Sequence, residues 1–176
     1  MWSPDLPVRV LALVLALAAA AAAGGCQVRP LYAGGGTGAE AVEPELRRIA
    51  VEVQRDRIAQ ELMNELIFAL RGGAALADPA YTLRLIVAAR KSELGIQVRE
   101  EVPTANLVTL TTTYTLTETV TGRVVASETI YNTASYDFSS QRFANLRAER
   151  DAENRAAKAA AEEIRTRLAL ALATKG

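Results

Sequence analysis

The chain has 176 residues, of which half are hydrophobic and 23% are charged, and this fits one ordinary globular domain with an additional N-terminal segment. Its 20 acidic and 20 basic residues balance, so no overall charge favours nucleic acid as a partner. Histidine is absent and cysteine occurs once, which excludes the commonest general base, an internal disulfide and a cysteine-rich zinc site.

The chain begins with a segment typical of protein export. Residues 10–23 are all apolar. A membrane-spanning helix needs about 20 such residues, whereas the hydrophobic part of a secretory signal needs about 7–15. Small residues follow and end at Gly25-Cys26, an order that resembles a bacterial lipobox, where a signal peptidase cuts in front of a lipid-modified cysteine. We therefore predict a signal peptide at residues 1–25, cleavage between Gly25 and Cys26, and a covalent diacylglycerol and N-acyl lipid on Cys26 in place of any other cofactor.

Two features depart from the usual lipobox. Ala23 stands where leucine is common, and Arg9 is offset by Asp5 in a region that is usually positive. The alternatives are a buried helix followed by an ordinary free cysteine, and an uncleaved signal anchor, which the short apolar run argues against. Gln27 follows the cysteine, and by resemblance to other lipoproteins it favours the outer membrane over the inner one.

A glycine-rich stretch follows the anchor. Residues 33–45 offer many backbone states and little apolar surface, so we predict a flexible tether there. The predicted organisation is a signal peptide, then a lipid-anchored segment with its tether at residues 26–47, and one domain at residues 48–176.

The domain is predicted to open with a strand and a helix. Residues 49–53 alternate in character as a short strand does. Asp56 can cap the following helix by accepting backbone N–H bonds, and Gly72-Gly73 can end it because glycine adopts the left-handed conformation. Between these limits, apolar residues recur at helical spacing: Ile58, Leu62, Leu66, Ala69 and Leu70.

Three strands are predicted next. Residues 81–91 and 107–120 alternate between two faces, and residues 124–137 return after a turn at Thr121-Gly122 with an uncertain register. A polar connection is expected at residues 92–104.

The last element is predicted to be a helix over residues 141–173, capped by Ser139 or Ser140. Its apolar stripe consists of Phe143, Leu146, Ala157, Ala160, Ala161, Ile164, Leu168 and Leu172. The element order β-α-β-β-β-α predicts an α+β fold, a two-layer sandwich with two helices packed on one face of a four-stranded mixed sheet. Because the first strand is followed by a helical crossover, it should lie parallel to its neighbour.

Few residues could carry catalysis. Cys26 is used by the lipid, and no histidine exists to activate a serine. Paired carboxylates occur at Glu100-Glu101 and Glu162-Glu163. Adjacent acids on a helix point about 100° apart, and a charged loop is normally solvated. We therefore expect neither an enzyme nor a metal site.

Threonine dominates one face of the strand at residues 107–120, at positions Thr109, Thr111, Thr113, Thr115, Thr117 and Thr119. The simpler interpretation is a solvent-facing sheet surface, because polar β-branched residues suit one. The alternative is contact with the polar wall of a partner. Arg84, Arg90 and Lys91 either solubilise the sheet edge or bind the phosphates of an anionic amphiphile.

Several short motifs, in order, resemble one family. Residues 26–32 read Cys-Gln-Val-Arg-Pro-Leu-Tyr, similar to the Cys-Gly-Phe-Arg-Pro-Leu-Tyr start of alphaproteobacterial lipopolysaccharide-assembly lipoproteins (LptE). Residues 57–66 resemble that family's Arg-x-x-Gln-x-Leu-x-Asn-x-Leu helix. Ala134-Ser135-Tyr136-Asp137 and Phe143-Ala144 resemble its last strand and final helix. The resemblance extends over essentially all of the mature chain.

The resemblance implies an outer-membrane lipoprotein that faces the periplasm and is inserted in the lumen of an LptD-type β-barrel, with one copy of each. Such a subunit plugs and assembles the translocon that delivers lipopolysaccharide to the cell surface. It also implies lipopolysaccharide binding through basic side chains, for which Arg84, Arg90 and Lys91 are the candidates. An alternative of a different class is a periplasmic-facing lipoprotein that binds a soluble ligand or acts as an envelope scaffold.

Overall fold

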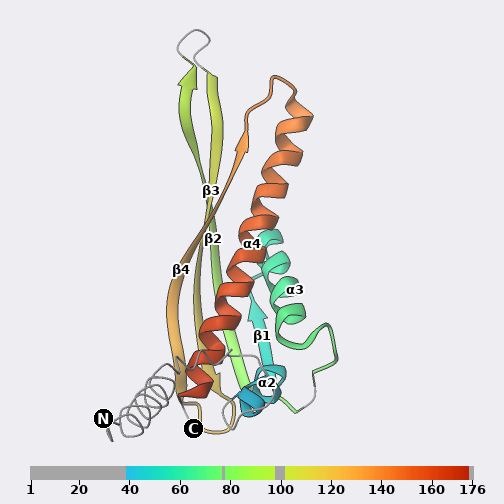
Figure 1. Ribbon diagram of the computed structural model, residues 1–176, viewed down its shortest axis with the longest axis vertical. Coiled ribbons are helices and arrows are strands. Elements are labelled where there is room, and N and C mark those ends of the chain that lie inside the picture. Colours follow the sequence, from blue (N-terminus) through green and yellow to red (C-terminus); the bar gives the residue numbers. More distant parts are fainter. Residues whose placement is uncertain (1–38, 77, 98–101, 175–176) are drawn as a thin grey trace, which may run out of the picture. The chain divides into compact units, whose positions relative to one another are not determined.

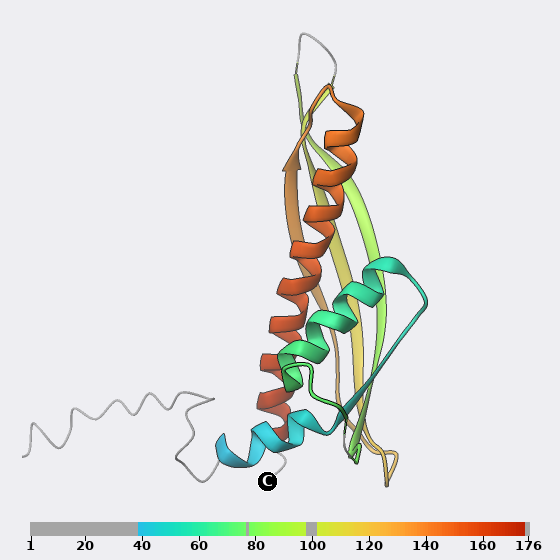
Figure 2. The ribbon, with the colours of Figure 1, turned by 90° about the vertical axis from the view of Figure 1, so that its right-hand side faces the viewer.

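The computed structural model describes residues 39–76, 78–97 and 102–174. Within these ranges the elements are α2 (Ala39–Arg47), β1 (Ile49–Val53), α3 (Arg57–Arg71), β2 (Tyr81–Gln97), β3 (Val102–Glu118), β4 (Val124–Asp137) and α4 (Arg142–Ala173). The strands form one sheet in the order β1-β2-β3-β4, and α3 and α4 lie over the same face of it (Figure 1, Figure 2). The predicted α+β sandwich with a four-stranded mixed sheet is confirmed.

The crossover between the first two strands has the predicted geometry. β1 runs parallel to β2, from Ile49 opposite Tyr81 to Val53 opposite Leu85, and the remaining strand pairs are antiparallel. Gly72 ends α3 in the left-handed conformation at φ 63°, and its N–H donates to the Phe68 carbonyl over 2.7 Å.

Both side-chain caps predicted from the sequence are wrong. Asp56 precedes α3 in an extended conformation, but its exposed side chain makes no capping bond. Gln141 precedes α4, also without a side-chain cap. In front of α4, the Asn145 side chain instead reaches back to the backbone of Ser139. Its Oδ1 accepts from the Ser139 N–H and its Nδ2 donates to the Ser139 carbonyl, each over 2.7 Å. Ser139 Oγ also accepts from the Gln141 N–H over 3.2 Å, so Asn145 and Ser139 together fix the entry to α4, although no serine side chain caps its first turn.

Helix α2 occupies residues that were expected to belong to a flexible tether. Val42 and Leu46, one helical turn apart, are buried, and α2 contacts both α3 and α4. Arg165 of α4 also lies 3.3 Å from Glu43. The tether prediction is wrong for residues 39–45, because two apolar side chains at helical spacing are enough to hold this segment on the domain.

The hairpin of β2 and β3 is longer than predicted. Residues assigned to a polar connection continue the pairing, from Ser92 opposite Leu107 to Gln97 opposite Val102. Residues 88–94 are exposed on both faces of β2. The alternation of apolar and polar residues that marks a half-buried strand is therefore missing there, although the backbone pairing is present.

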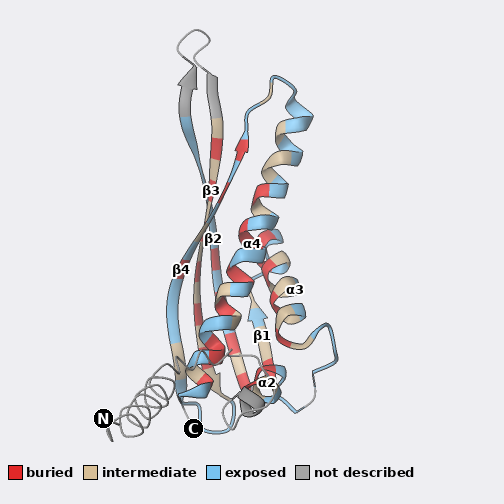
Figure 3. Cartoon of the chain, viewed as in Figure 1, coloured by how far each residue is buried: buried red, intermediate tan, exposed pale blue. Residues whose placement is uncertain are grey.

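The core lies between the sheet and the two long helices, where burial is concentrated in Figure 3. Its large, fully buried side chains include Leu62, Leu66, Leu70, Leu83, Leu110, Tyr114, Leu116 and Ile164. α4 contributes small residues to the same core: Ala152, Ala156, Ala157, Ala160 and Ala161 are essentially inaccessible. The backbone of α4 therefore approaches its neighbours closely.

The predicted apolar stripe of α4 is wrong at its N-terminal end. Phe143 is 81% exposed and Leu146 is 52% exposed, and the first buried residue of this helix is Ala152. The first turns of α4 extend beyond the part of the helix that lies beside α3 (Figure 1), so none of the other described helices covers them there. None of the described helices is both long enough and apolar enough to span a membrane.

Candidate functional site

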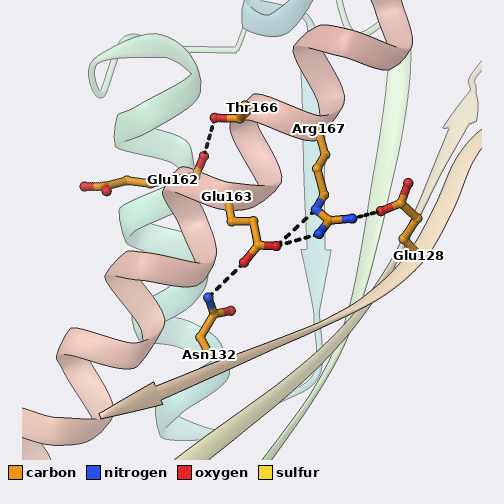
Figure 4. Close-up of polar contacts among 6 residues, drawn as sticks. All are labelled: Glu128, Asn132, Glu162, Glu163, Thr166 and Arg167. Carbon is orange, nitrogen blue, oxygen red and sulfur yellow. Dashed lines mark hydrogen bonds and ion pairs between the residues drawn. The ribbon is translucent and has the colours of Figure 1, made fainter.

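A polar cluster joins β4 to α4 on the helix side of the sheet (Figure 4). The Arg167 guanidinium donates to Glu163 Oε1 over 2.7 and 3.1 Å, and it also pairs with Glu128 on β4. Asn132 of β4 donates from Nδ2 to the other carboxylate oxygen of Glu163 over 2.9 Å. These contacts attach α4 to the edge strand of the sheet at two positions.

The contacts in this cluster shift the pKa values of its members. The hydrogen bond from Asn132, followed by the bond and charge of Arg167, lowers the pKa of Glu163 against the opposing effect of partial burial. Hydrogen bonds to Glu163 and Glu128 raise the pKa of Arg167. Burial, with the Glu128 carboxylate nearby, raises the pKa of Tyr114 to about 12. None of these three groups exchanges a proton near neutral pH, so the cluster has a structural role.

The two carboxylates at the centre of α4 do not act as a pair. Figure 4 shows the Glu162 side chain directed away from Glu163, as their positions on a helix predict, and the Glu162 carbonyl accepts a bond from Thr166 over 3.0 Å. Glu100 and Glu101 lie outside the described residues. In the described ranges, no three histidine, cysteine, aspartate or glutamate residues gather closely enough to hold a metal ion.

The opposite side of the sheet is covered by none of the described helices (Figure 2). The strand register places on this side a set of hydroxyl side chains from the two neighbouring strands β3 and β4, which we call the hydroxyl face: Thr109, Thr111, Thr113, Thr115, Thr117, Ser127, Thr129, Thr133 and Ser135. Thr113 and Thr129 stand opposite each other with their hydroxyl oxygens 2.8 Å apart. Thr115 and Ser127 also stand opposite each other, with their hydroxyl oxygens 3.1 Å apart. The predicted threonine row ends at Thr117, because β3 stops at Glu118 and Thr119 lies in the following turn, but the row continues onto a second strand.

Two large apolar side chains share this side of the sheet, one beside the hydroxyl face and one within its β4 row. Ile86 of β2 lies opposite Thr113, and Tyr131 of β4 lies opposite Thr111. Ile86 is 61% exposed and Tyr131 is 68% exposed. Neither residue was predicted from the sequence to belong to a site. An isoleucine in an otherwise polar row was a visible signal for Ile86, whereas the side on which Tyr131 lies depends on the β4 register, which only the structure resolves.

The three basic residues predicted to bind lipopolysaccharide do not share one surface. Arg84 and Arg90 lie on the same side of the sheet as the hydroxyl face, and Arg84 is 3.5 Å from Glu52 of β1. Arg90 forms no ion pair with any residue that the structure describes. Lys91 follows it in the same strand and therefore lies on the helix side. The predicted lipid site at Cys26 and the cleavage position at Gly25 lie outside the described residues.

Lys91 is held by two residues on the helix side. Its Nζ lies 3.0 Å from Glu149 Oε2 on α4 and 5.6 Å from the centre of the Tyr136 ring. The Tyr136 and Glu149 side chains raise the pKa of Lys91. Lys91 therefore bridges the sheet and α4, and its charge is already partnered.

The structure is a small α+β domain with one covered sheet face, one uncovered face rich in hydroxyls, and a polar cluster that joins α4 to β4. The chain belongs to the lipopolysaccharide-assembly family LptE, whose family model matches residues 46–168. It is thus a lipopolysaccharide-assembly lipoprotein by family, and that family is defined by assembly rather than by catalysis.

Solved structures of lipoproteins share the fold. A protein from Caulobacter crescentus described as a lipoprotein is 27% identical, with a TM-score of 0.62 over 77% of this chain and 98% of that one. A minor lipoprotein from Acinetobacter baumannii is 19% identical, with a TM-score of 0.56 over 69% of this chain and 90% of the other. Rare lipoprotein B from Shewanella oneidensis is 13% identical, with a TM-score of 0.52 over 72% and 94%. These last two show the fold alone. No curated protein matches the chain.

Proposed function

We propose that this chain is an outer-membrane lipoprotein of the lipopolysaccharide translocon, anchored through Cys26 and facing the periplasm. It inserts into the lumen of an LptD-type β-barrel, with one copy of each, and serves as plug and assembly partner. The family match over residues 46–168 carries this proposal, because that range includes all four strands, α3 and most of α4. The uncovered sheet face supports it, since the core does not need that face and a partner can use it.

The anchor and the domain have separate tasks in this proposal. An acylated cysteine with two or more chains gives stable membrane attachment, so the domain meets its barrel within the plane of one membrane. The domain supplies a rigid two-layer body.

Contact with lipopolysaccharide would use guanidinium groups, which form paired hydrogen bonds with phosphate. Arg90 suits this best among the three predicted residues, because Arg84 and Lys91 already have carboxylate partners.

The alternative is a periplasmic-facing lipoprotein that binds a soluble ligand or acts as an envelope scaffold. A soluble ligand needs a concave site that encloses most of its surface. Two grooves on α4, one beside Glu163 and Arg167 and one beside Arg147 and Arg150, are largely open to solvent, so neither of them encloses a ligand in this way.

Co-purification and depletion separate these two functions. An affinity-tagged full chain should bring down a large outer-membrane β-barrel from detergent-solubilised membranes, and depletion of the chain should reduce surface lipopolysaccharide and leave the barrel misassembled. A normal surface after depletion, with no barrel recovered, would contradict the proposal.

The Cys26→Ser variant tests the anchor on its own, since it should lose metabolic fatty-acid labelling. Unchanged labelling would remove the anchor from the proposal.

A further inference from the structure

The hydroxyl face has unused hydrogen-bonding capacity. Each hydroxyl carries one donor and two acceptor lone pairs. In the pairs Thr113–Thr129 and Thr115–Ser127, one hydroxyl donates to the other, so each pair keeps a free donor as well as free acceptors. The surface can therefore meet donors and acceptors of a partner equally well, without any charge being buried.

The same face is conformationally stiff. Seven of its nine residues are threonine, whose β-branched side chain has restricted χ1 freedom. Such side chains lose little rotamer entropy when a second surface covers them. The backbone beneath is also fixed, because β3 is paired on both sides, with β2 and with β4.

Charges are absent from the centre of this side of the sheet. Between Thr109 and Thr117 of β3, and between Ser127 and Ser135 of β4, the residues on this side carry no charge. The charged residues on this side lie on the strands around this centre: Glu52 on β1, Arg84 and Arg90 on β2, opposite Thr115 and Thr109, and Asp137 at the end of β4. Tyr131 lies within this uncharged centre on β4, and Ile86 lies beside it on β2.

We propose that the hydroxyl face, together with Ile86 and Tyr131, is the surface that lies against the inner wall of the partner β-barrel. This assignment rests on the proposed function. The wall of an outer-membrane barrel is a sheet whose inward residues are polar, and the stiff, hydroxyl-rich β3–β4 surface buries no charge of its own against such a wall. Ile86 and Tyr131 supply the large side chains that commonly dominate the energy of an interface.

Site-specific photo-crosslinking in living cells tests the assignment. Benzoylphenylalanine replaces Thr113 or Tyr131 on the proposed surface, or Gln60 or Asn64, which are exposed on α3 on the other side of the sheet. The anchored, affinity-tagged full chain is used throughout. We expect a covalent adduct with the barrel when the photo-crosslinker replaces Thr113 or Tyr131. We expect no adduct when it replaces Gln60 or Asn64. Adducts from α3 alone, or equally from both sides, would overturn the assignment while the proposed function stands.

A charge variant gives a second readout. Thr113→Lys combined with Thr129→Lys places two ammonium groups at the centre of the proposed surface, and recovery of the barrel should fall at least about tenfold. Asn64→Lys is the matched control and should leave recovery unchanged. Unchanged thermal unfolding of the purified variants would show that folding is intact. Full recovery with the double variant would overturn the assignment, whereas failure to recover any barrel with the unaltered chain would overturn the proposed function itself.

Discussion

Gln54 pairs its side-chain amide with the backbone of Val87, as a neighbouring strand residue would. Its Oε1 accepts from the Val87 N–H over 3.3 Å, and its Nε2 donates to the Val87 carbonyl over 2.5 Å. β1 ends at Val53, so the side chain of the next residue extends the ladder on β2 by one step. Beyond Val87, β2 has β3 as its only paired strand in the described sheet.

Gln54→Ala should therefore loosen the end of β1. The Val87 backbone groups would lose their protein partner in a partly buried position, and we expect a loss of about 1 kcal/mol in the free energy of unfolding. Hydrogen exchange at the Val87 amide should also accelerate. Gln54→Glu is an informative control, because a carboxylate still accepts from the N–H but cannot donate to the carbonyl, so its loss should be intermediate. Unchanged exchange in Gln54→Ala would show that this pairing is not maintained in solution.

Close packing of α4 makes its buried alanines intolerant of larger residues. Ala156→Leu inserts a large side chain into a fully occupied site, and overpacking of this kind costs about 1–3 kcal/mol or more. Ala159→Leu, three residues later on the exposed side of the same helix, should change stability by less than about 0.5 kcal/mol. Urea unfolding of both variants measures the difference. Similar losses would contradict the arrangement of α4 on its neighbours.

Local patterns predicted the elements whose two sides differ in exposure. β1 was placed at its observed bounds, and the end of α3 was read from Gly72. The same patterns failed where only backbone pairing or a few contacts hold the chain. The outer part of β2 is exposed on both sides and has no alternation to detect, and α2 is held by Val42 and Leu46 within a glycine-rich neighbourhood.

The candidate site was predictable only in part. Alternation placed Arg84 and Arg90 with the polar row of β2, and the same rule puts the adjacent Lys91 on the other side of the strand. The continuation of the hydroxyl face onto β4 and the position of Tyr131 both depend on a strand register set by long-range pairing. The bond between Asn132 and Glu163 depends on how α4 lies over β4, for which the sequence carries no local pattern.

Truncation of the two large residues beside the hydroxyl face should weaken barrel binding more than folding. Ile86→Ala and Tyr131→Ala remove mostly exposed side chains, so the free energy of unfolding should change little. Each should nevertheless lower binding by about 2 kcal/mol, the loss typical of a central interface anchor. Phe68→Ala on α3 is the matched control, since Phe68 is 69% exposed. If Phe68→Ala weakens binding as strongly, these two residues are not special to the interface.

Glu163 should make the stability of the domain depend on acid. Its pKa is lowered in the folded state from a reference value of 4.5, chiefly by Asn132 and then by Arg167. The unfolded chain therefore binds a proton more readily, so the stability from this group is fully present above about pH 4.5 and is lost as pH falls through the lowered pKa. Glu163→Gln should be less stable than the unaltered chain at neutral pH, and this difference should shrink on acidification.

Urea unfolding over a series from about pH 7 to about pH 3 measures how this difference changes on acidification. Glu162→Gln changes the neighbouring carboxylate, which points away from the cluster, and should track the unaltered chain throughout. Because other carboxylates also titrate in this range, the decisive quantity is the gap between the unaltered chain and Glu163→Gln. A gap that stays constant as pH falls would show that the contacts of Glu163 with Asn132 and Arg167 do not favour its charged form.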